Sequence, residues 1–508
     1  MFTPYNPESP GLKTGNEGNF KSKYKERPRP FAPGYTGFTN KTLCSMLFAL
    51  CLLYILPGCQ PALLKGRPPL ENEGEVYLYL DPFPQEAERL RFNIEKVFAV
   101  SSDGREFPLS ISLTELKPSS LRRQRLLASG QLPSGQYAGF SFKVKKATLK
   151  VEDGETDLLV PETPVRIDFP MNVQRKKAYA ILLAFRYKES IAGGFSFSPS
   201  FSFSLPARPL MSLTGYVTNQ HSNNLTVFDK KTGRVAGVIA TGGKPSGMAL
   251  DQRAGRAYVA ISGEDTIDLI DVTAGEIVDR IKLLAGDKPH ELALTPDGRI
   301  LLVGNKGSST VSFINPFSLL EVGRVNVGRE PNSILIDPNG RKAFVFNTLS
   351  GTISVIDIPN RALVTTLTTD PGPIRGEFNR RGDRLYVIQE LSSYLTIINP
   401  LSLSVLKRVS VRMGMRSIKV DTRTDLVYLG KGNDILVEVY EPFSFVPVDS
   451  IRTEGGIIYM TIDGEENNLY MVNPETRSVM ISNLVRKKIV TEIDVGEGPY
   501  WVTMMGER

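Results

Sequence analysis

The chain contains very few of the side chains on which metal centres, disulfides and haem attachment depend. Its 508 residues include two histidines, His221 and His290, three cysteines and one tryptophan. Two histidines exclude a multi-histidine metal centre, and no Cys-x-x-Cys-His haem attachment occurs. The last cysteine is Cys59, so no intramolecular disulfide can form beyond it. No Gly-x-Ser-x-Gly nucleophile elbow is present either. We therefore predict no metal and no cofactor.

An excess of basic residues is also missing from most of the chain. The formal net charge is +7, but residues 1–58 hold seven Lys and Arg against three Glu, which leaves only +3 for the remainder. A nearly balanced folded part does not indicate a basic groove for nucleic acid. We predict no nucleic-acid partner.

A single long apolar run lies near the N-terminus. It extends from Leu43 to Leu56, follows the basic Lys41, and has the length of a secretory h-region. The string Leu56-Pro57-Gly58-Cys59 after it resembles a bacterial lipoprotein box, which implies that Cys59 is lipidated and becomes the mature N-terminus. Pro57 is an unusual residue at its place in such a box. We expect an exported, lipid-anchored protein of the cell envelope, held on the outer membrane, periplasmic or surface side.

The alternative is a membrane anchor that is never cleaved. No charged residue occurs between Lys41 and Lys65, a stretch long enough to cross a bilayer of about 30 Å. Against it, Pro57, Gly58 and Pro61 interrupt the second half of that stretch. The polar, Pro- and Gly-rich residues before Lys41 are expected to be disordered. We assign 1–58 to a disordered leader with a lipoprotein-type signal or anchor, and 59–72 to a linker.

Residues 73–206 have the composition of a small β-sandwich. Strands are expected at residues 75–80, 138–144, 147–151 and 178–185, separated by turn signals such as Asp103-Gly104 and Asp153-Gly154. Residues 195–203 alternate Phe with small polar residues, which predicts a strand with one wet and one buried face. Residues 117–127 could form a short basic helix or a loop. This segment resembles the small sandwich modules that precede binding domains in bacterial envelope proteins.

Residues 207–508 are dominated by a repeat of about 42 residues. One position follows a Gly or Asp and begins each unit; it is occupied by Pro245, Pro289, Pro331, Pro373, Met415, Ile457 and Pro499. A second position lies in an apolar strand and is occupied by Tyr216, Tyr258, Leu302, Phe344, Tyr386, Tyr428 and Tyr470. Both series are spaced by 42 residues except for one step of 44. Such a period, with several short strands and Asx-Gly turns in each unit, is typical of a β-propeller.

The repeats also predict how the ring closes. The strand that begins at Gly215 has no inner strand before it, and the last inner strand, residues 500–504, has no aromatic strand after it. Pairing these two strands completes seven four-stranded blades and removes two exposed edges. Trp501 is then expected at the seam. The predicted fold is all-β, with a seven-bladed β-propeller preceded by the small β-sandwich domain.

The repeat region resembles a named family. Tyr216-Val217-Thr218-Asn219 spells the motif of the YVTN-family β-propellers, and Tyr258-Val259, residues 344–347 and Tyr386-Val387 are degenerate copies of it. The resemblance covers about residues 211–508. It implies a seven-bladed propeller of a family whose members are mostly secreted or surface-anchored, and it implies no particular reaction. Blades six and seven depart most, since Met415 and Ile457 replace the repeated Pro.

The candidate site is the ring of residues directly after the repeated Pro, where each inner strand starts near the mouth of the central channel. A framework position should be alike in every blade, whereas these residues differ. Besides Ser246, Ile374 and Ile458, the ring contains the candidate ligand-binding residues His290, Glu291, Asn332, Arg375, Arg416, Tyr459, Tyr500 and Trp501. Unlike polar groups that converge over an apolar floor are what a ligand site requires. A solvated channel mouth, however, is polar in any case.

Two functions are compatible with this ring. The first is a non-enzymatic, membrane-tethered scaffold whose propeller binds another envelope protein or a glycan. The second is a hydrolase of the lactonase type, in which His290 and Glu291 transfer protons. Arg375 and Arg416 could hold a carboxylate or a phosphate through paired hydrogen bonds. We favour the binding scaffold, because the chain offers few groups suited to catalysis.

Overall fold

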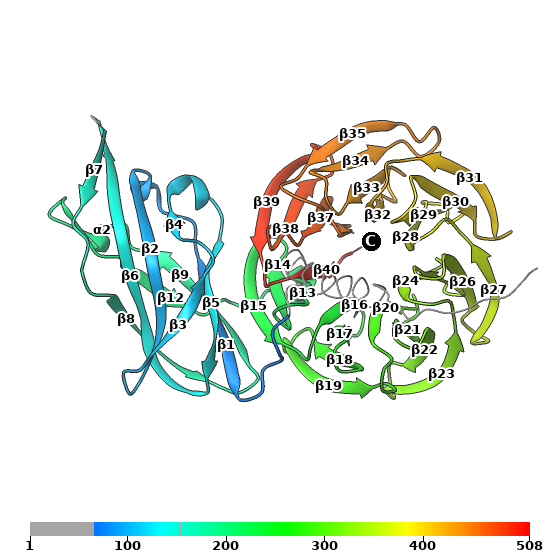
Figure 1. Cartoon of the computed structure of the whole chain (residues 1–508), viewed down its shortest axis with the longest axis horizontal. Coiled ribbons are helices and arrows are strands. Elements are labelled where there is room, and N and C mark those ends of the chain that lie inside the picture. Colours follow the sequence, from blue (N-terminus) through cyan, green and yellow to red (C-terminus); the bar gives the residue numbers. More distant parts are fainter. Residues whose placement is uncertain (1–65, 153, 508) are drawn as a thin grey trace, which may run out of the picture. The chain divides into compact units, whose positions relative to one another are not determined.

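The computed structural model describes residues 66–152 and 154–507 (Figure 1). They belong to one compact unit, Leu64–Arg508. The leader, the apolar run and Cys59 lie outside the described residues. Within the described part, no helix is long and apolar enough to cross a membrane. The fold is all-β, with a small strand domain preceding a seven-bladed propeller.

The first domain is one curled sheet whose two halves pack against each other. Strand order in the sheet is β12-β9-β1-β5-β3-β2-β6-β7, with β4 beside β2 and β8 beside β6. The main strands are β1 (Glu73–Leu80), β2 (Leu90–Ser101), β3 (Glu106–Ile111), β4 (Glu115–Leu116), β5 (Arg125–Pro133), β6 (Gly135–Val151), β7 (Gly154–Leu158), β8 (Val165–Val173), β9 (Ala178–Phe185) and β12 (Phe201–Ser204). Short elements complete it: η1 (Gln85–Ala87), η2 (Pro118–Ser120), α2 (Tyr187–Ser190), β10 (Ile191–Ala192) and β11 (Ser196–Phe197).

Aromatic residues fill the core between the two halves of this sheet. Phe92 of β2 lies 5.4 Å from Phe185 of β9, measured between ring centroids, and Phe142 of β6 lies 5.1 Å from Phe201 of β12. Because β3 pairs with both β2 and β5, the two packed halves are joined into a half-barrel rather than separated as in a simple sandwich. The predicted all-β domain is thus present with a more continuous sheet than expected.

Two local predictions for this domain need correction, and one open alternative is decided. Of the short basic helix and the loop considered for residues 117–127, the structure has a loop with the three-residue turn η2, and β5 begins at Arg125. The Phe-Ser run forms two short strands, β11 and β12, because Pro199 cannot donate a ladder hydrogen bond. The expected alternation of buried and exposed side chains also fails at the start of this run, where Phe195 is 62% exposed. Residues 138–151, expected as two strands, belong to the single long strand β6.

Seven four-stranded sheets form the propeller ring (Figure 1). Blade one contains β40 (Pro499–Met504), β13 (Thr214–Asn219), β14 (Asn224–Asp229) and β15 (Arg234–Ala240), and η3 (Met211–Leu213) precedes it. Blade two contains β16 (Pro245–Asp251), β17 (Arg256–Ile261), β18 (Thr266–Asp271) and β19 (Glu276–Lys282). Blade three contains β20 (Pro289–Leu294), β21 (Leu301–Asn305), β22 (Thr310–Asn315) and β23 (Leu320–Asn326). Blade four contains β24 (Pro331–Ile336), β25 (Lys342–Asn347), β26 (Thr352–Asp357) and β27 (Ala362–Thr368).

The remaining three blades follow the same plan. Blade five contains β28 (Pro373–Phe378), β29 (Leu385–Gln389), β30 (Tyr394–Asn399) and β31 (Ser404–Ser410). Blade six contains β32 (Met415–Val420), β33 (Val427–Lys431), β34 (Leu436–Tyr440) and β35 (Pro447–Arg452). Blade seven contains β36 (Tyr459–Asp463), β37 (Asn468–Asn473), β38 (Ser478–Asn483) and β39 (Lys488–Asp494). Blade seven has Ile457 in place of the repeated Pro, and its inner strand starts two residues later, at Tyr459.

The ring closes through the C-terminal strand, as the two unmatched strands of the sequence predict. Strand β40 pairs with β13, with Trp501 opposite Thr218 and Val502 opposite Val217. Trp501 is 8% exposed at this seam. The pairing covers the inner edge of β13, and β40 becomes the innermost strand of blade one, as the first strand is in every other blade.

The repeated motif residues hold the blades together. Tyr216, Tyr258, Tyr386 and Tyr470 are fully buried between neighbouring blades. The motif residue Asn219 donates to the side chains of Asn224 and Thr226, and Asn305 donates in the same way to Thr310 and Ser312. These bonds fix the loop between the second and third strands of a blade. The motif residues therefore stabilise the blades and do not themselves form a ligand site.

Segment 66–72 is attached to blade one by a single arginine. The Arg67 backbone N–H donates to the His221 carbonyl (3.0 Å), and Asn223 Nδ2 donates to the Arg67 carbonyl (2.5 Å). Its guanidinium lies 3.2 Å from Glu75 and 2.9 Å from Glu497. Burial raises the pKa of Glu75 to about 7, although Tyr77 and Arg67 oppose the shift. Three of these four contacts join the N-terminal segment to the propeller, and the fourth joins it to Glu75 of β1.

Candidate functional site

The face of the propeller that carries the candidate site is defined by two sets of loops. Neighbouring strands of a blade run in opposite directions. The loop between the second and third strands and the loop that leads to the next inner strand therefore lie on the same face of the propeller. Hydrogen bonds join the two sets: Gly307 N donates to the Asp287 carbonyl, and Val411 N donates to the Ser393 carbonyl. We call the surface made by these loops the mouth face. Each inner strand starts there and runs toward the opposite face.

A cavity of about 580 Å³ opens at the mouth face above the central channel. Its volume is in the range of small-molecule and glycan sites. Six different blades contribute to it, and the lining residues are His290, Lys306, Asn332, Ile374, Arg375, Glu390, Gly414, Arg416, Gly432, Asn433, Ile458 and Tyr500. Five of the predicted site residues therefore line the same cavity: His290, Asn332, Arg375, Arg416 and Tyr500.

Glu291, Tyr459 and Trp501 lie deeper, around the side chain of Arg375. The Arg375 guanidinium forms an ion pair with the Glu291 carboxylate, and its central carbon lies 4.8 Å from the Tyr459 ring centroid and 5.0 Å from that of Trp501. The two rings stack with centroids 3.8 Å apart. Arg375 Nε and Trp501 Nε1 are buried without a hydrogen-bond partner among the described residues. We call these four residues the channel plug.

Burial controls the protonation of the plug. Burial raises the pKa of Glu291 to about 7, and the charge of Arg375 acts in the opposite direction. Burial would lower the pKa of Arg375, but Glu291 beside it raises it overall. A cation between two aromatic rings gains from their electron-rich faces when it is desolvated. The plug thus holds a mutually neutralised ion pair inside the channel, with no free charge to offer a ligand.

A second cavity, of about 360 Å³, lies beyond the plug at the opposite end of the channel. Trp501 lines it, together with Thr503 and Glu507 of the C-terminal segment. Glu507 accepts hydrogen bonds from the hydroxyls of Thr461 and Thr503. Because Arg375 lines only the mouth cavity and Trp501 only this one, the plug separates the two.

The predicted pair of anion-binding arginines is not available as such. Arg375 is neutralised by Glu291, and Arg416 Nη2 lies 2.6 Å from Glu390 Oε1. Each guanidinium therefore already has a carboxylate partner. Arg416 is 45% exposed, so its pair is weak and can exchange for a ligand, whereas Arg375 is fixed.

His290 is held as a neutral hydrogen-bonding group. Its Nε2 lies 2.8 Å from the Tyr500 hydroxyl. Burial, together with the positive charges of Lys306 and Arg375, lowers the pKa of His290 to about 3. Glu291 is the next residue along the strand and is tied to Arg375, so the two groups proposed for proton transfer are engaged with different partners.

This depressed pKa leads to a testable pH dependence. A group whose pKa falls from 6.5 in the unfolded chain to about 3 in the folded chain stabilises the fold fully above pH 6.5. That contribution is lost as the pH falls from 6.5 toward 3. We expect the melting temperature of a His290→Gln variant to depend less on pH in this window than that of the native chain, measured by circular dichroism. Parallel profiles would contradict a buried neutral His290.

Besides Gly414 and Gly432, three lining residues with polar side chains were not predicted from the sequence: Lys306, Glu390 and Asn433. Lys306 Nζ lies 2.9 Å from Glu330 Oε1 at the rim. These residues follow the second strand of their blades, whose end reaches the same face as the repeated Pro. Because the second strand of each blade runs toward the mouth face, the residues after it form a second ring of variable residues there. The strand direction would therefore have indicated these three residues. Ser246 was in the predicted ring, but it is fully buried and bonds to backbone carbonyls.

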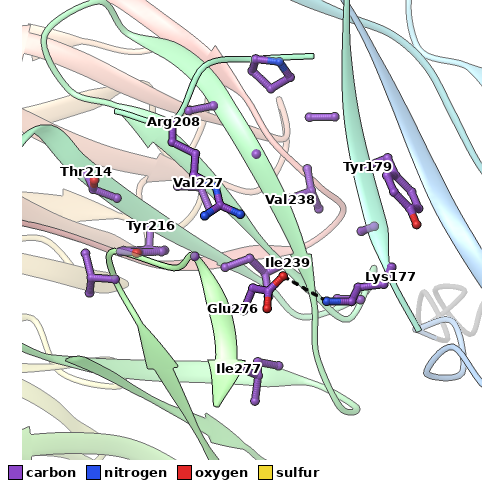
Figure 2. A pocket seen from close by; sticks show the side chains of 18 of the residues that line it. Lys177, Tyr179, Arg208, Thr214, Tyr216, Val227, Val238, Ile239, Glu276 and Ile277 are labelled. Atoms are coloured by element: carbon purple, nitrogen blue, oxygen red, sulfur yellow. Dashed lines mark hydrogen bonds and ion pairs between the residues drawn. The ribbon is translucent and has the colours of Figure 1, made fainter. Parts of the chain in front are cut away.

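A third cavity, of about 590 Å³, lies outside the channel, against the outer strands of blades one and two (Figure 2). Its walls are mixed: Val238, Ile239 and Ile277 supply apolar surface, and Lys177 and Arg208 supply polar surface. At its edge Lys177 of β9 forms an ion pair of 3.3 Å with Glu276 of β19, drawn as a dashed line in Figure 2. No sequence pattern indicated this cavity, because it arises only where β9 packs beside β15. Among the described residues no group of His, Cys, Asp and Glu could hold a metal ion.

The architecture is that of a seven-bladed β-propeller with a mouth cavity built from unlike residues. Residues 212–419 match the model of the YNCE-like beta-propeller family. This match and the seven blades fit a YVTN-type seven-bladed propeller. No curated protein matches the chain significantly.

Solved structures resemble the chain in fold. A functionally unknown protein from Desulfotomaculum acetoxidans is 16% identical, with a TM-score of 0.50, over 57% of this chain and 98% of its own. A chain of the Kuenenia stuttgartiensis hydrazine synthase is 19% identical, with a TM-score of 0.45, over 50% of this chain and 87% of its own. At these identities nothing about activity follows from either likeness.

Proposed function

We propose that this protein is a membrane-anchored, non-enzymatic binding scaffold of the cell envelope. Its propeller binds an envelope protein or a glycan at the mouth cavity. The β-propeller fold supports a binding or scaffold role. The observation that carries the proposal is the mouth cavity itself, where blades of one repeated framework present different polar side chains. Anchorage through a lipid on Cys59 rests on the sequence string around that residue.

The geometry gives the hydrolase alternative less support. His290 shares its ring nitrogen with Tyr500, and Glu291 is paired with Arg375. A general base must reach the proton that it removes, and neither group faces the mouth cavity as a free base. The exposed and exchangeable groups of the cavity are instead Arg416 and Glu390, which suit recognition of a polar ligand.

Arg416 provides the test. The tagged full chain, purified from membranes after mild crosslinking, should enrich its partner, and Arg416→Glu should reduce that enrichment by at least about tenfold, because it opposes Glu390 with a like charge. Arg381→Glu, which changes an exposed arginine in the hairpin at the opposite face, should leave the enrichment unchanged. Immobilised envelope polysaccharide can replace the extract to test a glycan directly. Equal enrichment by both variants would refute binding at the mouth.

A further inference from the structure

Five large apolar side chains stand exposed at the tips of loops on the mouth face. They are Leu284, Leu349, Leu391, Met413 and Ile435, with exposed fractions between 44% and 64%. Leu284 and Met413 lie in loops that lead to inner strands, and the other three lie between second and third strands. They are spread from the connection between blades two and three to blade six, and so form an arc around the cavity. Apolar groups gathered on one face commonly mark an interaction surface.

The first described residues of the chain lie against this same face, on the other side of the ring. Arg67 is bonded to His221 and Asn223 in the mouth-face loop of blade one, and to Glu497 in the loop that leads to β40. Cys59 lies seven residues before Gly66 in the sequence. Seven extended residues span about 25 Å at most. A lipid on Cys59 would therefore hold the blade-one side of the mouth face close to the bilayer.

From these two observations we propose that the mouth face lies on the lipid bilayer, with the five apolar loop tips inserted at its interface. This docking rests on the proposed membrane anchorage. The short tether holds the blade-one side, and the apolar arc holds the side made by blades two to six. The mouth cavity then opens toward the bilayer, so its ligand must be carried by the membrane, as a lipid-linked glycan or as a segment of a membrane protein.

The charges on this face show which force holds it there. Lys306 is paired with Glu330, and Arg416 is paired with Glu390. The mouth-face loops also carry Lys244, Lys288, Arg329 and Arg412, but acidic residues of the same loops outnumber the basic ones, so the face has no surplus of cations. Attraction to anionic lipid requires such a surplus. The contact is therefore made by apolar insertion, and it should persist on zwitterionic phosphatidylcholine and in high salt.

The opposite face offers matched controls. Phe317, Leu401, Phe443 and Val485 are 74% to 83% exposed there. They occupy the same turn between the third and fourth strands in different blades, and this turn points away from the face that Arg67 joins. Their exposure exceeds that of the five loop tips, so burial in the fold cannot explain a difference between the two sets.

The experiment uses the full chain, with Cys44 and Cys51 replaced by Ser, reconstituted into phosphatidylcholine vesicles that contain nitroxide-labelled phosphatidylcholine. An environment-sensitive fluorophore is attached to Met413→Cys or, as control, to Leu401→Cys, and the chain without an introduced cysteine gives the background. We expect quenching by the labelled lipid to be at least about twofold greater at position 413. Adding Leu349→Glu and Leu391→Glu should abolish the excess, whereas adding Phe317→Glu and Phe443→Glu should not.

Flotation of the vesicles distinguishes the two possible failures. A chain that floats with the vesicles but shows equal quenching at positions 413 and 401 overturns the docking and leaves the anchorage intact. A chain that does not float overturns the anchorage and, with it, the docking. Quenching at position 413 that requires anionic lipid would also contradict apolar insertion.

Discussion

Replacing Arg375 with Met is expected to destabilise the protein by about 3–5 kcal/mol, because it leaves the Glu291 carboxylate buried without its partner. Arg375 also loses its contacts with the Tyr459 and Trp501 rings. Adding Glu291→Gln should recover most of the loss, since a neutral pair has little desolvation cost. Urea unfolding followed by circular dichroism measures both changes, and the fluorescence of Trp501, the only tryptophan, reports on the plug.

The pH dependence of the stability of these variants gives a second test of the plug. The pKa of Glu291 is raised from 4.5 to about 7, so the folded chain binds its proton more tightly than the unfolded chain does. The resulting stabilisation is complete below about pH 4.5 and is lost as the pH rises through 7. Glu291→Gln alone should remove this slope. A double variant as unstable as Arg375→Met, or an unchanged slope, would refute the pairing described for the plug.

Removing residues 499–508 is expected to abolish cooperative folding of the propeller. Strand β40 supplies the inner strand of blade one, and Trp501, Val502 and Met504 are all buried. Each such side chain contributes roughly 1.5–3 kcal/mol, so their joint loss approaches a total stability of about 5–15 kcal/mol. The truncation also exposes the edge of β13, which promotes aggregation. Solubility and the sharpness of thermal unfolding measure the effect.

A synthetic peptide of residues 496–508 separates strand pairing from chain length. If β40 acts by closing blade one, the peptide should restore a sharp thermal transition to the truncated chain when added during refolding. A scrambled peptide of the same composition is the control. A truncated chain that unfolds as cooperatively as the native one would show that the seam does not hold the ring.

The propeller could be predicted from the sequence because its geometry repeats. The 42-residue spacing from Pro289 to Pro331 reports a unit that every blade must satisfy, and Gly298 and Gly340 adopt the left-handed φ values, +71° and +69°, that their hairpins require. The first domain has no such repetition. Strand β6 extends through residues 138–151 because neighbours on both sides support it, and no local pattern reports that support.

The site was only half predictable for a related reason. Position in the repeat placed His290, Arg375 and Tyr500 near the channel, but pairing between blades decides what they can do. Arg375 meets Glu291 across 84 residues of sequence, and Tyr500 meets His290 across 210. Considered one at a time, charged residues such as Arg375 are expected to be free, but their partners in the closed ring neutralise them.

The channel plug blocks the centre of the ring, around which Figure 1 shows the inner strands. With Arg375 held between Glu291 and two stacked rings, the channel is a cup with a floor at mid-depth. A polymer cannot thread through such a cup from one face to the other. A partner can insert only an end or a loop, and it must leave by the opening through which it came.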